Sequence, residues 1–132
     1  MKLFDRTLSQ LENALDVRMV RHNVLAGNLA NADTPGYVAR DVDFAAAMAA
    51  AEASDAAAPA APRHIPLGTD AQAIEAATVR AEGAPAGMDG NAVDADRALV
   101  ALAENGLQYG AAAKTAARKL AILRYVASDG GA

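Results

Sequence analysis

The chain has 132 residues and a mass of 13.4 kDa, which is enough for one domain. Alanine accounts for 37 of the residues, and because small side chains bury little apolar area, the chain has difficulty building a large core by itself. The net charge of −4 gives no attraction to nucleic acid, and the lack of cysteine excludes disulfides, thiol nucleophiles and cysteine-based zinc sites. This composition favours a component of an assembly.

The first predicted element is a helix within residues 1–33. Large side chains recur in it at spacings of mostly three and four residues and form one face. They are Phe4, Leu8, Leu11, Leu15, His22, Leu25 and Leu29. The helix should end near Asp33, because Thr34 precedes Pro35 and a residue before proline is disfavoured in the α conformation. Pro35 and Gly36 suit the centre of a type II turn, since proline presets φ and glycine supplies a positive φ.

The next two predicted segments are irregular. Residues 34–44 should hold the turn and an extended stretch, and residues 45–93 an irregular, flexible middle rich in alanine, proline and glycine. Pro59 and Pro62 would end any helix that began before them, and at most a helical turn or two is expected around residues 71–82. With few large apolar side chains, this middle cannot offset an ordering cost of about 1–2 kcal/mol per residue.

The last predicted element is a helix over residues 94–128, with Asp94 as a favourable N-cap. Its apolar residues alternate at spacings of three and four without a charge, which is typical of a coiled-coil seam. The seam comprises Leu99, Leu102, Gly106, Tyr109, Ala113, Ala116, Leu120 and Leu123. A long helix cannot bury such a stripe against itself, so the N-terminal helix and other copies are its predicted partners. The predicted fold class is all-α: long N- and C-terminal helices packed as an antiparallel coiled-coil hairpin, joined by an irregular middle into one domain.

No catalytic, cofactor-binding or metal-binding constellation is found in the sequence. His22 and His64 do not lie at metal-ligand spacing, and Asp41 and Asp43 have no partner base. No serine has the Gly-x-Ser-x-Gly context, and no glycine pattern resembles a phosphate-binding loop. The sequence therefore predicts a protein that is not an enzyme, with neither nucleic acid nor a small-molecule substrate among its partners.

The segment around the predicted turn resembles the N-terminal motif of the flagellar rod and hook protein family. That motif has two asparagines three residues apart and then Thr-Pro-Gly-Tyr; the matching residues are Asn28, Asn31, Thr34, Pro35, Gly36 and Tyr37. Gly27 stands where the family usually has the first of two paired asparagines, a departure that leaves the turn intact. The stretches 39–44 and 91–97 and the short length resemble the proximal rod subunits, since distal relatives carry extra domains between the helices.

The resemblance implies a structural subunit of the proximal rod of the flagellar basal body. Such subunits polymerise into the axial shaft that transmits torque from rotor to hook, and the six motif residues and the seam would pack subunits together. The implied partners are copies of the chain, other rod proteins, the rod-to-ring adaptor and MS ring, and the flagellar type III export apparatus in transit.

The implied location is the periplasmic rod of the basal body, reached without a cleaved signal peptide. The N-terminal sequence agrees, because Asp5 and Arg6 interrupt the apolar segment that such a peptide needs. Two alternatives stay open. One is another proximal rod subunit of the same family, and the other is a soluble coiled-coil adaptor, which would share the heptads but has no need of the motif.

Overall fold

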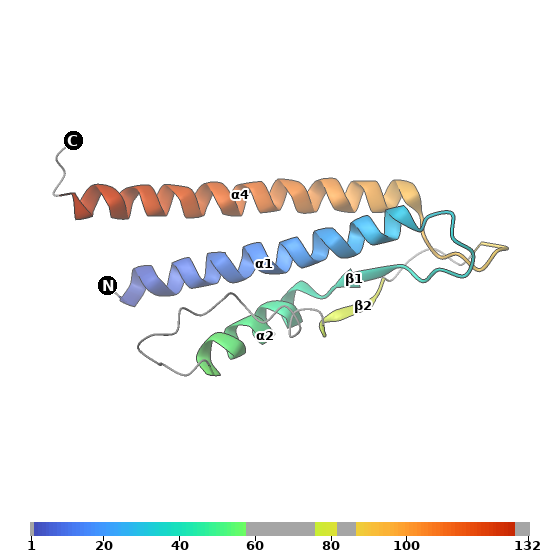
Figure 1. Ribbon diagram of the computed structural model, residues 1–132, viewed down its shortest axis with the longest axis horizontal. Helices are drawn as coiled ribbons and strands as arrows, with labels where there is room; N and C mark the ends of the chain where they lie inside the picture. The colour runs from blue at the N-terminus through green and yellow to red at the C-terminus, as the bar shows by residue number, and fades with distance from the viewer. Residues whose placement is uncertain (1, 58–75, 82–86, 129–132) are drawn as a thin grey trace.

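The computed structural model describes residues 2–57, 76–81 and 87–128 of the chain (Figure 1). Two long helices, α1 (Lys2–Ala30) and α4 (Ala95–Ala127), lie side by side along the molecule. At 1.5 Å per residue, the 33 residues of α4 span roughly 50 Å. The start of α1 and the end of α4 lie at the same end of the molecule, so the two helices are antiparallel. The predicted all-α hairpin of long terminal helices is confirmed.

The ends of both helices follow from local chemistry. Asp94 adopts an extended backbone, and its carboxylate accepts a hydrogen bond of 3.1 Å from the N–H of Arg97, which makes it the predicted N-cap of α4. α1 ends at Ala30, slightly before the predicted boundary. The N–H of Asn31 is shared between two carbonyls, those of Gly27 and Asn28, and the chain then leaves the helix through turns.

A smaller layer covers the side of α1 that faces away from α4 (Figure 1). It is made of strand β1 (Arg40–Val42), helix α2 (Phe44–Ala57) and strand β2 (Thr78–Arg80). β1 falls in the stretch that was predicted to be extended. α1 therefore lies in the centre of the molecule and contacts α4, β1 and α2.

The prediction of an irregular middle needs correction where that middle is described. α2 is regular because alanine has the highest helix propensity, and because the carboxylate of Asp43 accepts a hydrogen bond of 3.0 Å from the N–H of Ala46 at the start of the helix. Ala47 and Ala51 have no exposed surface, so their small side chains let α2 lie close to its neighbours. Pro59 and Pro62, predicted to end such a helix, lie outside the described residues.

β2 is the second correction. The helical turns expected around residues 71–82 are absent from the described part of that range, where residues 78–80 form a strand antiparallel to β1, with Arg80 opposite Arg40. Thr78 and Val79 are β-branched and favour extended backbone, and β1 offers them a hydrogen-bonding partner. A ribbon of two strands is marginal alone, so its contacts with α1 hold it in place.

The apolar core is small. Val17 of α1 is fully buried and packs with Val42 and Ala47. Leu25 and Ala98 are the buried apolar residues on the described parts of α1 and α4 beyond that cluster. Since stabilisation scales with the apolar area removed from water, packing within one chain contributes little.

Candidate functional site

The Thr-Pro-Gly-Tyr motif forms the predicted turn directly after α1. The N–H of Tyr37 donates to the carbonyl of Thr34 at 3.2 Å, and Gly36 has a φ of +72°. A positive φ at the third position is the mark of a type II turn. Asn31 ties this turn to the helix, because its amide donates to the carbonyl of Gly27 at 2.8 Å and its Oδ1 accepts from the hydroxyl of Thr34 at 3.2 Å.

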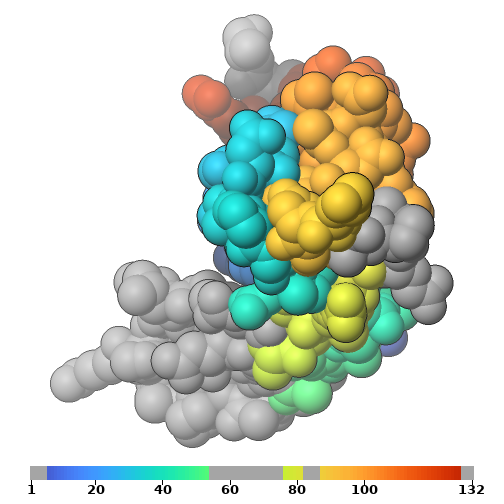
Figure 2. Space-filling view, turned by 90° about the vertical axis from the view of Figure 1, so that its right-hand side faces the viewer, coloured from blue at the N-terminus to red at the C-terminus, as the bar shows by residue number. Residues whose placement is uncertain are grey.

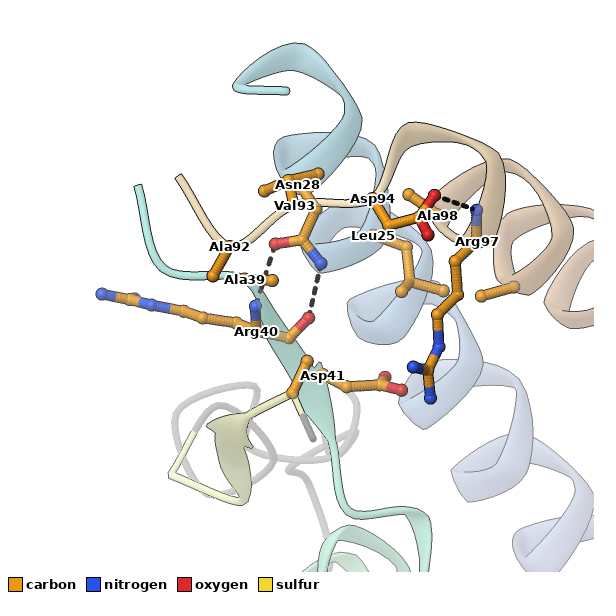
Figure 3. A pocket seen from close by; sticks show the side chains of 12 residues that line it. Leu25, Asn28, Ala39, Arg40, Asp41, Ala92, Val93, Asp94, Arg97 and Ala98 are labelled. Carbon is orange, nitrogen blue, oxygen red and sulfur yellow. Dashed lines mark hydrogen bonds between the residues drawn. The ribbon is translucent and has the colours of Figure 1, made fainter. Parts of the chain in front are cut away.

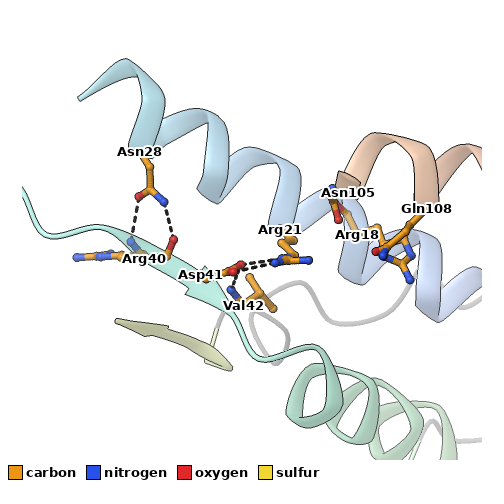
Figure 4. Close-up of polar contacts among 8 residues, drawn as sticks. All are labelled: Arg18, Arg21, Asn28, Arg40, Asp41, Val42, Asn105 and Gln108. Atoms are coloured by element: carbon orange, nitrogen blue, oxygen red, sulfur yellow. Dashed lines mark hydrogen bonds and ion pairs between the residues drawn. The ribbon is translucent and has the colours of Figure 1, made fainter. Parts of the chain in front are cut away.

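The other motif asparagine, Asn28, serves a different partner. Its side chain is buried, with 4 % exposed, and faces β1 (Figures 3 and 4). Nδ2 donates to the carbonyl of Arg40 at 2.6 Å, and Oδ1 accepts from the N–H of Arg40 at 3.0 Å. The amide thus takes the place of a peptide group of a neighbouring strand and closes the edge of β1 that β2 leaves free. Spacing places the two asparagines on one helix face, but it does not show that their partners differ.

Asn91 was not predicted as a site residue, yet it joins the two halves of the chain. It is 7 % exposed, and its Nδ2 lies 3.1, 2.6 and 2.9 Å from the carbonyl oxygens of Asn31, Ala32 and Thr34. Its Oδ1 accepts from the N–H of Val93 at 2.7 Å. Asn91 therefore caps the C-terminal end of α1 from a distant part of the sequence. In the sequence, Asn91 follows a turn-forming Asp-Gly pair and begins the stretch 91–97 that resembles proximal rod subunits, but neither feature indicates its hydrogen-bond partners.

Backbone hydrogen bonds lock the same two segments together. The N–H of Gly36 donates to the carbonyl of Asp89 at 3.1 Å, and the N–H of Ala92 donates to the carbonyl of Tyr37 at 3.0 Å. In Figure 2 the turn after α1 and the segment before α4 lie against each other at the tip of the hairpin. The family-like motif is thus one half of a joint, and residues 87–93 are the other half.

An ion pair also holds β1 against α1, farther from the C-terminal end of α1 than the joint. Arg21 donates to both oxygens of Asp41, from Nε at 2.7 Å and from Nη2 at 2.8 Å (Figure 4). Burial alone would raise the pKa of Asp41, but the hydrogen bonds from Arg21 and from the N–H of Val42, with the charge of Arg21, outweigh it and lower the pKa. The hydrogen bond to Asp41 raises the pKa of Arg21, against a smaller opposing effect of burial. A cavity of about 280 Å³ lies beside this pair, and Arg97 reaches into it from α4 toward Asp41 (Figure 3).

Polar side chains also set how α4 meets α1. Asn105 is 1 % exposed and donates to the carbonyl of Arg18 at 2.9 Å (Figure 4). Arg18 in turn donates to the side chain of Gln108, and its guanidinium lies 4.6 Å from the centre of the Phe44 ring. Burial, and then the charge of Arg21, lowers the pKa of Arg18. A buried asparagine in a helical seam favours one register over others, because a shifted helix would leave it without its partner.

The predicted seam coincides with the surface that meets α1 at only some of its positions. Its partly buried members are Leu102, Tyr109, Ala113, Ala116 and Leu123. Leu99 and Leu120 are 49 % and 55 % exposed, and Gly106 is also exposed. Ala98 and Asn105, each one residue earlier than a predicted position, are the buried ones. The leucines at the edge of the interface are thus left for contacts outside the chain, and their part in subunit packing stays a prediction.

The outer face of α4, turned away from α1, carries large apolar side chains. We define it by Val100, Leu107, Ile122 and Tyr125, all of which are at least half exposed. Leu107 is the most exposed of them, at 76 %. No described helix is long and apolar enough to cross a membrane. Nor do the described residues gather three or more histidine or acidic side chains that could hold a metal ion.

Comparison with known proteins identifies the family. A family model described as "Flagella basal body rod protein" matches residues 6–37. The flagellar basal body rod protein FlgB of Escherichia coli (strain K12) is 41 % identical over 116 residues, covering 80 % of each chain. The chain belongs to the flagellar basal body rod protein family. FlgB of Salmonella typhimurium is 38 % identical over 116 residues, with 80 % of each chain covered, and FlgB of Cereibacter sphaeroides 40 % over 96 residues, with 73 % covered.

The chain is thus a structural subunit of the flagellar basal body rod. The stretch that the family model matches comprises most of α1 and the turn after it. α1 is the element that contacts α4, β1 and α2, so the matched stretch is also the centre of the fold. The segment 87–93, which completes the joint at the tip, lies outside that match.

Two glycine substitutions in this rod protein should have opposite effects on the isolated chain. Gly36→Ala should lower the free energy of unfolding by about 1–2 kcal/mol, because a φ of +72° brings a Cβ too close to the following carbonyl. Gly106→Ala should raise it by about 0.5–1 kcal/mol, because alanine is the better helix former and its Cβ meets no atom within 4 Å. Urea unfolding followed by circular dichroism measures both. An unchanged midpoint for Gly36→Ala would contradict the turn.

The Arg21–Asp41 pair should make stability depend on acid. Because the folded-state pKa of Asp41 is lowered, the pair stabilises the fold above the ordinary pKa of an aspartate, near 4, and its contribution is lost as the pH falls through the lowered folded-state pKa. Urea midpoints measured from pH 6 to about pH 3 should therefore fall more steeply for the wild type than for Asp41→Asn. Parallel pH profiles for the two proteins would show that the pair contributes nothing.

Proposed function

We propose that the chain polymerises by helix packing into the proximal part of the rod, the axial shaft that transmits torque from rotor to hook. The observation that carries this proposal is the outer face of α4, where Val100, Leu107, Ile122 and Tyr125 stay exposed along a helix of 33 residues. A row of large apolar residues along a rigid helix is typical of a surface that another protein covers. Relatives named FlgB, as rod proteins, support the basal body as the place where it is covered.

The partners in this proposal are copies of the chain, other rod proteins, and the rod-to-ring adaptor and MS ring at the base. The joint at the tip supports a load-bearing role, because α1 is held to the segment before α4 by Asn91 and to β1 by Asn28 and Arg21. Contacts at the tip, together with the hydrogen bond from Asn105 to Arg18 farther along the helices, resist sliding of one helix past the other. A hairpin that keeps its shape can pass torque to its neighbours.

The route to the rod is the flagellar type III export apparatus, which would take the chain as an unfolded substrate, without removal of a signal peptide. The small core supports this part of the proposal. Few large apolar side chains are buried among the described residues, so we expect a low free energy of unfolding, which would let the chain be threaded before it assembles. The missing burial is then regained between subunits in the periplasmic rod.

Electron microscopy of basal bodies from a strain that lacks the gene tests the proposal. Rotor rings without a rod, with rods restored by the wild-type gene, are the expected result. A matched complementation with a gene whose Asp94–Ser128 region is deleted should leave the rings bare, because α4 and its outer face are lost. Complete rods in the strain without the gene would refute the proposal and favour a coiled-coil adaptor.

A further inference from the structure

A groove of about 410 Å³ lies between α1 and the β1–β2 ribbon, and neither residue of the Arg21–Asp41 ion pair lines it. The polar residues of its lining include Asn23, Tyr37, Arg40 and Arg80. All four can donate hydrogen bonds, two carry a positive charge, and no carboxylate belongs to the described lining. Gly27 also lines the groove, beside the hydroxyl of Tyr37. Such a lining fits a carboxylate.

The two arginines of this groove repel one another. Arg40 and Arg80 are directly opposite in the register of the ribbon, both are exposed, and neither forms an ion pair with a carboxylate of the described residues. Like charges directly opposite on paired strands are destabilising. Arg40 also points away from the body of the chain (Figure 4). The ribbon therefore gains stability from a negatively charged partner that comes from outside.

The helix face of α1 that carries Asn23 of the groove also carries acidic residues. Positions 12, 16, 19 and 23 recur at spacings of four, three and four, which places them on one helix face. Glu12 is exposed and Asp16 is partly so, and neither pairs with a cation among the described residues. Two acids four residues apart on a helix repel each other as the arginines do. Along the helix, Glu12 and Asp16 lie roughly 16 and 10 Å from Asn23 of the groove, at 1.5 Å per residue.

We propose that the Arg40–Arg80 groove of one copy receives Glu12 and Asp16 of the next copy in the rod, an inference that rests on the proposed function. The contact relieves both like-charge pairs at once, so it selects a neighbour and its stagger more than it adds affinity. Because the groove and the acidic pair are different parts of the surface, head-to-tail contacts leave a free groove at one end of a row of copies and a free acidic pair at the other. Contacts of that kind extend into an open helical polymer.

Cysteine cross-linking tests the contact directly, because the chain has no cysteine of its own. A chain with Glu12→Cys and Arg80→Cys, assembled into basal bodies, should give a ladder of dimers, trimers and larger species on mild oxidation. Either single variant should give no ladder, and neither should Glu104→Cys with Arg80→Cys, since Glu104 lies on α4. Dimers alone would show a closed pair, and rods that contain the chain without any cross-link would show no contact. Both results overturn the inference while the rod function stands.

Exchanging the charges of the two surfaces is a second test of the contact. Arg40→Glu/Arg80→Glu and Glu12→Arg/Asp16→Arg should each reduce rods per basal body by about tenfold or more, the factor that corresponds to about 1.4 kcal/mol. All four changes in one chain keep the net charge at −4 and should restore assembly. The matched control combines Arg40→Glu/Arg80→Glu with Glu52→Arg/Glu104→Arg and should not restore it. Equal rescue by the four-residue swap and by the matched control would show an effect of net charge alone and would refute the contact. Normal rods in a strain that lacks the gene would instead refute the rod function itself.

Discussion

Replacing Asn91 with alanine should lower the free energy of unfolding of the isolated chain by about 2–3 kcal/mol. The buried amide is shared among three carbonyls at the end of α1, and each net hydrogen bond is worth about 1 kcal/mol. The same change frees the segment before α4 from the turn after α1. Urea unfolding followed by circular dichroism should show the loss as a lower midpoint with an unchanged slope.

Asn91→Asp is the matched variant, because it keeps the shape and the acceptor for the N–H of Val93 but replaces the donating amide by a carboxylate. A negative charge beside the C-terminal carbonyls of α1 meets the negative end of the helix dipole. We therefore expect Asn91→Asp to be at least as destabilising as Asn91→Ala at neutral pH. An aspartate variant as stable as the wild type would show that the three contacts do not cap the helix.

Leu107→Asp should abolish rod formation while leaving the isolated chain almost unchanged. Leu107 is 76 % exposed in one chain, so a charge there costs the monomer no more than about 0.5 kcal/mol. In the rod, the same side chain would be covered by another subunit, and a buried, unpaired carboxylate is strongly destabilising. Complementation of a strain without the gene, scored by swimming and by electron microscopy of basal bodies, measures assembly, and circular dichroism of the purified variant measures the fold.

The contrasting variant is Val17→Ala, which opens a cavity in the small core. Val17 is fully buried within one chain, so its truncation should lower the free energy of unfolding by about 1–3 kcal/mol and leave the outer face of α4 intact. Val17→Ala should therefore destabilise the isolated chain more than Leu107→Asp does, whereas Leu107→Asp should impair rod assembly more than Val17→Ala does. Normal rods built from Leu107→Asp would mean that the outer face of α4 stays in water after assembly.

Local signals in the sequence were sufficient for the helix ends and the turn. Asp94 is an N-cap because its carboxylate accepts a backbone N–H within its own turn, and Pro35-Gly36 makes a type II turn because of the φ preferences of those two residues. Each depends on neighbours in the chain alone. The antiparallel hairpin also followed, since two long amphipathic helices in a short chain must bury their stripes together.

Tertiary partners could not be read in the same way. The spacing of Asn28 and Asn31 predicted that both lie on one face of the helix, but not that Asn28 pairs with the backbone of Arg40. Nothing in the sequence linked Asn91 to the end of α1. The predicted seam on α4 differs from the residues that are buried in one chain. The reason is that the apolar pattern of a helix reflects all the surfaces it packs against, both within the chain and in an assembly. Within one chain the buried positions are Ala98 and Asn105, while Leu99 and Leu120 lie at the edge. Of the four leucines in the pattern, Leu102 and Leu123 are partly buried against α1, and the other two are about half exposed.

The most direct measurement is cryo-electron microscopy of the basal body at a resolution that shows side chains. The account predicts that the rod wall contains the α1–α4 hairpin, joined at its tip through the turn 34–37, with Leu107 and Tyr125 buried against neighbouring subunits. A rod without this hairpin, or a hairpin whose outer face of α4 stays in solvent, would contradict it.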